Sequence, residues 1–125
     1  MLQRDVAVSH EYVGNSASYL GDAELAETSY RTMYEVMAAL LEAEPDNVLR
    51  VRDVSISLAK LGASQQTANQ LDAALESFAQ AAAMQKRLVD ADPENVQSKL
   101  ELFVAYFNLG QIEQDRAGYD QAAKW

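Results

Sequence analysis

The sequence predicts an all-α protein, an α-solenoid of antiparallel helical hairpins with about two and a half repeats. The first observation is a repeat at an interval of 48 residues, in which Arg4-Asp5-Val6 returns as Arg52-Asp53-Val54 and Pro45 returns as Pro93. The second is that apolar residues lie three and four positions apart, as on one face of a helix. The third is that no segment alternates apolar and polar residues between turn residues, so no strands are predicted.

The first unit is expected at about residues 1–44 and contains two helices. Its second helix carries an apolar stripe at helical spacing, made of Ala26, Tyr30, Met33, Leu40 and Leu41. The same half of the unit is crowded with carboxylates, against a single arginine: Asp22, Glu24, Glu27, Glu35, Glu42, Glu44 and Asp46. These form either a solvated helix face that aids solubility or a surface that attracts a cationic peptide.

The second unit, at about residues 45–92, has two apolar stripes separated by polar residues. The first stripe is Val51, Val54, Leu58 and Leu61, and its helix is expected to end near Gly62. The second stripe follows the polar residues 63–70 and consists of Ala74, Phe78, Ala81, Leu88 and Val89. Each unit is therefore expected to be a helical hairpin.

The third unit, at about residues 93–125, is expected to be incomplete. Asp92-Pro93 is typical of an N-cap followed by proline at the first helical position, and Glu44-Pro45 is a weaker version before the second unit. The chain stops at Trp125, before the equivalent of Phe78, so the last helix is expected to be cut short. Apolar residues left uncovered there favour self-association through the ends of a fragment of a larger repeat protein.

Composition limits the classes of function. The chain has 125 residues, which suits one domain (1–125), and a net charge of −9, which disfavours a nucleic-acid partner. Without cysteine it has no disulfide, thiol nucleophile or thiolate ligand. No apolar run is long enough for a signal peptide or a membrane span, so a cytoplasmic location without membrane contact is the default expectation.

No pattern of catalytic or cofactor-binding residues is apparent. His10 lies in a segment that vaguely resembles a histidine phosphotransfer motif, but in the repeat it aligns with apolar Leu58 and with Tyr106, which favours a structural role. The acids at positions 90, 92 and 94 fit helix capping better than acid–base catalysis. With one histidine, no oxygen-rich loop and no phosphate-binding glycine loop, we expect no metal, no cofactor and no enzyme activity.

The repeat positions resemble the tetratricopeptide family, whose signature is W-x2-L-G-x2-Y, then A-x3-F, then P. The leading position holds His10, Leu58 and Tyr106. The L-G pair is Val13-Gly14, Leu61-Gly62 and Leu109-Gly110, and the A-x3-F pair is Ala26/Tyr30 and Ala74/Phe78. The resemblance places the turn between the two helices at Gly21, Asn69 and Ala117. The tyrosine of the signature is replaced by Ala17, Gln65 and Glu113.

The units are longer than a standard unit of about 34 residues, by about two helical turns in each helix. The chain therefore resembles the long-helix tetratricopeptide arrays of bacterial proteins, whose units carry a phrase like residues 3–9. In each unit a glycine is expected where the two helices approach closely. A row of basic residues beside acidic ones (Arg4, Arg50, Arg52 and Lys99 beside Asp5, Asp53 and Glu101) is interpreted as inter-repeat ion pairs.

The resemblance implies a non-catalytic scaffold that binds a protein or peptide on its concave face, which the first helix of each hairpin lines. By register the partner-binding residues are Glu11, Tyr12, Asn15, Tyr19, Lys60, Gln66, Phe107, Asn108 and Gln111, with Ala59, Ala63 and Gln114 beside them. Because Lys60 is the only cation in this set, the lysine-rich clamp for chaperone tails is not expected. The alternative is a regulatory or self-assembly segment of a multidomain signalling protein.

Overall fold

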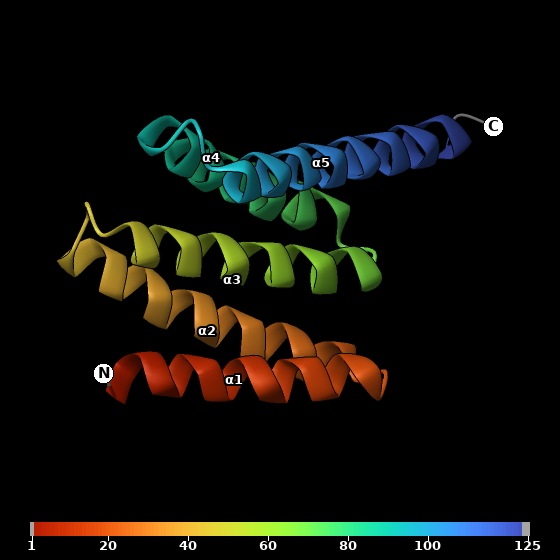
Figure 1. The fold of residues 1–125 in the computed structure, drawn as a ribbon. Coiled ribbons are helices and arrows are strands. Elements are labelled where there is room, and N and C mark those ends of the chain that lie inside the picture. Colours follow the sequence, from red (N-terminus) through yellow and green to blue (C-terminus); the bar gives the residue numbers. More distant parts are fainter. Residues whose placement is uncertain (1, 124–125) are drawn as a thin grey trace.

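A computed structural model of the chain describes residues 2–123, so Met1, Lys124 and Trp125 lie outside the described residues. It contains five α-helices (Figure 1): α1, Leu2–Tyr19; α2, Ala23–Ala43; α3, Val48–Thr67; α4, Leu71–Ala91; and α5, Val96–Ala123. Residues 2–123 contain no strand. The prediction of an all-α fold is therefore confirmed.

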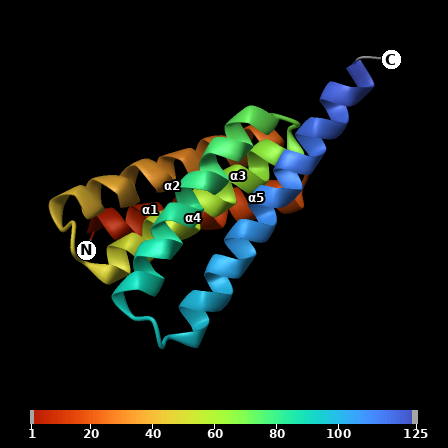
Figure 2. The same cartoon turned by 90° about the horizontal axis from the view of Figure 1, so that it is seen from above.

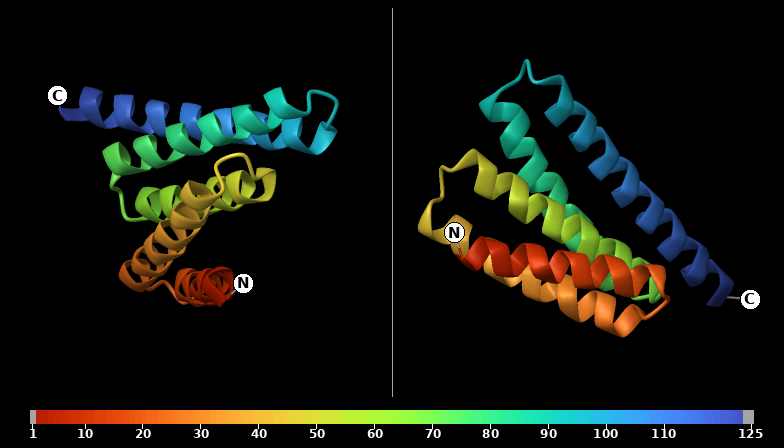
Figure 3. Two further views of the ribbon diagram at one scale, coloured as in Figure 1. Left: turned by 90° about the vertical axis from the view of Figure 1, so that its left-hand side faces the viewer. Right: turned by 60° about the horizontal axis from the view of Figure 1, so that its bottom comes forward.

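Successive helices run in opposite directions, and each packs on its neighbours in the chain. α1 pairs with α2 and α3 pairs with α4 as antiparallel hairpins, and α2 and α3 pack on each other to join the two. α5 packs on α4, and its C-terminal end projects past the α3–α4 turn (Figures 2 and 3). Consequently α1, α3 and α5 all run in the same direction.

The core lies between successive helices and contains the predicted apolar stripes. Val51, Val54, Leu58 and Leu61 of α3 are all at most 4% exposed. From α2 and α4 the buried members include Ala26, Tyr30, Met33, Ala74, Phe78, Ala81 and Leu88, whereas Leu40, Leu41 and Val89 are half-buried. The periodicity thus identified the inward faces of α2, α3 and α4 correctly.

Each connection between successive repeat units is a β-turn with proline at its second position. The amide of Asn47 donates to the carbonyl of Glu44 at 3.0 Å, and the amide of Asn95 donates to that of Asp92 at 3.1 Å. Proline suits this position because its φ is already close to the value that the turn requires. These turns reverse the chain between α2 and α3 and between α4 and α5.

Helices α3 and α5 are capped by asparagine, not by the acid before proline. The Oδ1 of Asn47 accepts hydrogen bonds from the amides of Leu49 at 3.0 Å and Arg50 at 3.4 Å. The Oδ1 of Asn95 accepts from the amide of Ser98 at 3.1 Å. The prediction of N-caps at Asp92 and Glu44 is wrong, since both residues end the preceding helix, and the two residues after each acid form the turn.

Within the hairpins, the turns lie where the family resemblance placed them. Gly21 has φ +80° and Asn69 has φ +61°, a left-handed conformation that glycine and asparagine adopt most readily. The prediction that the first helix of the second unit ends near Gly62 is wrong, because α3 continues to Thr67. Buried polar groups hold its last turn in the core: the hydroxyl of Ser77 donates to Gln65 Oε1 at 2.7 Å.

The third unit is one continuous helix, not the start of a hairpin. The turn expected at Ala117 is absent, because α5 runs without a break to Ala123. Alanine is the strongest helix former and pays a steric cost in the left-handed conformation that Gly21 and Asn69 adopt at this repeat position. The expected incomplete second helix is therefore replaced by an extension of the first.

Candidate functional site

The first helices of successive units are joined by ion pairs that recur with the repeat. Arg4 on α1 donates to the two carboxylate oxygens of Asp53 on α3 at 3.0 and 3.2 Å. The equivalent Arg52 on α3 donates to Glu101 on α5 at 3.1 Å. The prediction of inter-repeat ion pairs is confirmed for these two arginines. Lys99 takes part in none of the ion pairs found among the described side chains.

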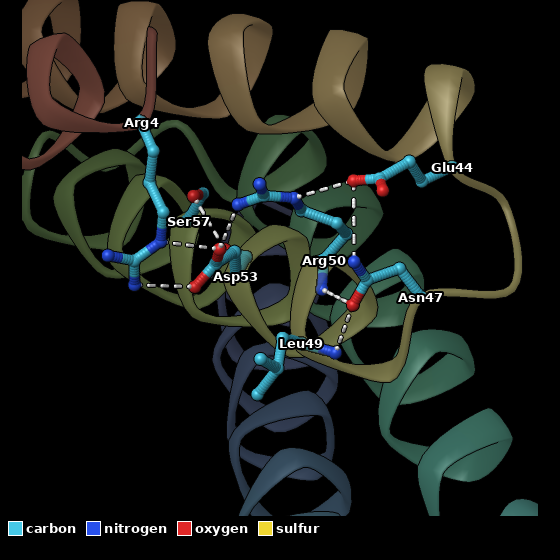
Figure 4. Close-up of polar contacts among 7 residues, drawn as sticks. All are labelled: Arg4, Glu44, Asn47, Leu49, Arg50, Asp53 and Ser57. Atoms are coloured by element: carbon cyan, nitrogen blue, oxygen red, sulfur yellow. Dashed lines mark hydrogen bonds and ion pairs between the residues drawn. The ribbon is translucent and has the colours of Figure 1, made fainter. Parts of the chain in front are cut away.

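Asp53 lies at the centre of the polar network in Figure 4. Its side chain is only 10% exposed and also lies 3.7 Å from Arg50, which pairs with Glu44 at 3.4 Å. The hydrogen bond and the charge of Asp53 raise the pKa of the Arg4 guanidinium above its ordinary value. The network ties α1, α3 and the α2–α3 loop together. It therefore sets α1 and α3 side by side as parts of one face.

Three residues predicted to bind a partner meet on this face. The ammonium of Lys60 lies 3.6 Å from Glu11 Oε2 and donates to Asn15 Oδ1 at 3.2 Å. The same Asn15 oxygen accepts from the hydroxyl of Tyr30 at 2.6 Å, and the Lys60 ammonium sits 5.7 Å from the centre of the Tyr30 ring. Lys60 is thus held by a carboxylate, an amide and an aromatic ring.

Two hollows open beside Lys60, which lines both. The first, of about 330 Å³, lies between α3 and the first hairpin, and its lining includes Tyr30, Ala63 and Thr67. The second, of about 420 Å³, lies between α3, α4 and α5, and its lining includes Ile56, Leu100 and the predicted residue Asn108. Both volumes fall in the range of small ligand sites. We refer to the surface of α1, α3 and α5 around these hollows as the binding face.

Of the remaining predicted residues, Ala59 lines the second hollow and the others lie outside both hollows. Tyr12 is the repeat equivalent of Lys60, but it is 68% exposed in a separate hollow with Leu20 and Leu25, because no described helix precedes α1. Tyr19 is 92% exposed near the end of α1, and Phe107 is 58% exposed on α5. Two further predicted residues line neither hollow: Gln66, which is half-buried, and Gln111, which is exposed.

Other side chains singled out in the sequence have structural surroundings. His10 is half-buried on α1 and lines neither hollow. Asp22 caps α2 by accepting from the amide of Leu25 at 3.1 Å, and Glu27 pairs with Arg31 at 2.8 Å. Within residues 2–123 no three histidine, cysteine, aspartate or glutamate side chains are grouped to hold a metal ion. None of the described helices is both long and apolar enough to cross a membrane.

Sequence reasoning missed two buried polar side chains that line the second hollow. The two missed residues, Ser55 and Gln85, line it together with Glu101 and with apolar residues of α3, α4 and α5. A comparison of equivalent repeat positions was the signal that could have found them. Ser55 and Gln85 stand where the first unit has Ala7 and Met37, so polar groups replace apolar ones inside the fold.

Comparison with known proteins finds no relative of this chain. No protein-family model matches the chain, and no curated protein or solved structure is significantly similar to it. Functional inference therefore rests on the residues and on their arrangement.

Proposed function

We propose that this chain is a non-catalytic scaffold, a tetratricopeptide-like α-solenoid that binds a protein or peptide on its binding face. The observation that carries the proposal is the pair of hollows on that face, which share Lys60 and take their walls from all five helices. Two neighbouring hollows of this size suit successive side chains of one extended or helical segment.

The ion pairs between the first helices support this proposal because they hold the face in one arrangement. Arg4 bridges α1 to α3, and Arg52 bridges α3 to α5. A surface that is already ordered loses less conformational entropy when a partner binds. The binding face carries an ammonium group, side-chain amides and carboxylates that take part in ion pairs. Such groups can form hydrogen bonds and ion pairs with a partner.

Affinity capture with a matched pair of variants tests the proposal. Lys60→Glu reverses the charge on the binding face and removes the ion pair with Glu11. Lys86→Glu makes the same change outside both hollows, where Lys86 pairs with Asp90 at 3.0 Å. The hydrogen bond with Asp90 raises the pKa of Lys86 above its ordinary value.

Proteins captured from a lysate by the wild type and by Lys86→Glu, but lost with Lys60→Glu, support the binding face. Both variants must first show unchanged helical circular dichroism and matched thermal melts. Partners that bind all three proteins equally would contradict the proposal. Loss with Lys86→Glu alone would move the site to α4.

A second candidate function is self-assembly, and the exposed apolar surface of α5 favours it. Phe103 is 68% exposed, Phe107 58% and Tyr106 50%. Aromatic groups gathered on one helix are typical of interfaces. Size-exclusion chromatography with light scattering tests this candidate. Self-assembly predicts a dimer that Phe103→Gln with Phe107→Gln dissociates and that Tyr119→Gln, further along the same helix, leaves intact.

A further inference from the structure

The two hairpins differ in the side chains that fill the space beneath the binding face. In the first hairpin this space holds Met33 and Met37, which are 2% and 1% exposed. The equivalent residues of the second hairpin are Ala81 and Gln85, which are just as buried at 2% and 6%. A small side chain and an amide therefore replace two large apolar ones, and the hollow of about 420 Å³ lies beside them.

Gln85, which lines this hollow, has one hydrogen-bond acceptor that is unpaired. Its Nε2 donates to Ser55 Oγ at 2.8 Å, and the Ser55 hydroxyl donates to the carbonyl of Ala81 at 3.5 Å. With the amide in this orientation, Ser55 accepts from Nε2 and its single proton is directed at the carbonyl of Ala81. Gln85 Oε1 is then buried without a hydrogen-bond partner, which is costly for a folded protein.

Glu101 of α5, which also lines the hollow, has a second unpaired acceptor. Its Oε1 accepts from Arg52 and from Gln97, both at 3.1 Å, whereas its Oε2 is buried without a partner. Lys60, at the edge of the hollow, is already engaged by Glu11 and Asn15. Two residues that line the hollow, Gln85 and Glu101, therefore each carry a buried acceptor without a hydrogen-bond partner, and one of these acceptors is charged.

The walls of the hollow are mostly apolar. They are formed by Ile56 and Ala59 of α3 and by Leu100 and Val104 of α5. A side chain with an apolar stem and a donor-rich cationic head fits such a site, because the stem packs on the walls while the head reaches the acceptors. The net charge of −9 also favours a cation.

Resting on the proposed peptide-binding function, we infer that this hollow binds an arginine side chain of the partner, whose guanidinium donates to Glu101 Oε2 and Gln85 Oε1. Arginine fits better than lysine because its planar fork carries five donors and can serve acceptors on two different helices. Such a site is the electrostatic opposite of one that grips a terminal carboxylate with lysines.

A titration of the isotope-labelled protein with two peptides tests the inference. The first probe is acetyl-Ala-Leu-Arg-Leu-Ala-amide, and the second replaces arginine by citrulline, which has nearly the same shape without the charge. The inference predicts that the arginine peptide binds about tenfold more tightly or better. It also predicts shifts in the NMR signals of the Gln85 side-chain amide and of the amides of Glu101 and Ala105.

Variants separate the acceptors from a general charge effect. Glu101→Gln is expected to abolish the preference for arginine over citrulline. Glu113→Gln makes the same change in net charge on an exposed part of the same helix, and it is expected to keep the preference. Retention of the preference in Glu101→Gln, or equal loss in both variants, would overturn the inference.

The double variant Ser55→Ala with Gln85→Met makes the second hairpin resemble the first. If these groups only stabilised the fold, their removal would lower the melting temperature. The inference predicts an equal or higher melting temperature together with loss of the preference for arginine. A lower melting temperature with an unchanged preference would overturn it.

The outcomes also separate this inference from the proposed function. Equal binding of both peptides, with shifts on the binding face, would overturn the arginine assignment and leave the peptide-binding face in place. If neither peptide shifts any signal of the hollow, the inference fails. The proposed function fails as well only if Lys60→Glu captures the same partners as the wild type.

Discussion

The two complete hairpins and the single helix α5 share a repeat but not its packing. A Cβ added at Gly14 would lie 2.5 Å from the Tyr30 ring, and one at Gly62 would lie 3.2 Å from the Phe78 ring. A Cβ at Gly110 would have no atom within 4 Å. The glycine thus allows close approach only where a second helix places an aromatic ring over it.

The largest expected effect is overpacking at these glycines. Gly14→Leu should destabilise the fold by about 3 kcal/mol or more, because the Tyr30 ring is buried and held by its hydroxyl. Gly62→Leu should cost about 1–3 kcal/mol. Urea unfolding followed by circular dichroism measures both. Unchanged midpoints would mean that the rings do not pack on the glycines.

The next effect compares the two inter-repeat ion pairs. Asp53→Asn removes the charge that Arg4 and Arg50 share at a side chain only 10% exposed, so it should cost about 1.5–3 kcal/mol. Glu101→Gln acts on an ion pair whose two side chains are 25% and 32% exposed, and it should cost less than about 1 kcal/mol. Thermal melts at low and high salt measure both. Equal losses would show that α5 is anchored as firmly as α3.

Gly110→Ala should change stability in the opposite direction. The added methyl group would have no atom within 4 Å, so it causes no steric clash. Because alanine has a higher helix propensity than glycine, the variant should be more stable by about 1 kcal/mol. Gly14→Ala, measured in the same urea series, should be destabilising. Destabilisation by Gly110→Ala would indicate that a second chain or an unseen segment covers this helix.

The smallest expected change in stability comes from the aromatic residue that packs on the glycine of each hairpin. Tyr30→Phe should cost about 0.5–1 kcal/mol, because it removes the hydroxyl that donates to Asn15 at 2.6 Å. The second hairpin has Phe78 at the ring position and Ala63 at the equivalent of Asn15, so it makes no such bond. In a double-mutant cycle, Asn15→Ala should cost little more once Tyr30 is phenylalanine. Additive losses would show that the two side chains act separately.

The repeat and its periodicity predicted much of the fold. The spacing of Val51, Val54 and Leu58 identified the buried side of α3, and the recurring arginines predicted the contacts with Asp53 and Glu101. These features repeat in the sequence and depend on a single helix face, or on one pair of neighbouring units. Local pattern is therefore enough to reveal them.

Features that depend on several helices could not be predicted in this way. The length of α3 follows from the bond between Ser77 and Gln65 across the hairpin, and polar residues at its end gave the impression of a loop. The hollow near Gln85 exists because α3, α4 and α5 meet around side chains smaller than those of the first unit. Among the residues predicted to bind a partner, Lys60 and Asn108 line the two hollows of the binding face, whereas Tyr12 lines a separate hollow on α1, the first of the described helices.

The most direct test of the binding face is amide hydrogen exchange of the chain with and without a partner recovered by capture. The proposed face predicts slower exchange in α1, α3 and α5, centred on the segments around Lys60 and Asn108, with little change in the exposed parts of α2 and α4. Protection confined to α2 and α4, with none near Lys60, would contradict the account.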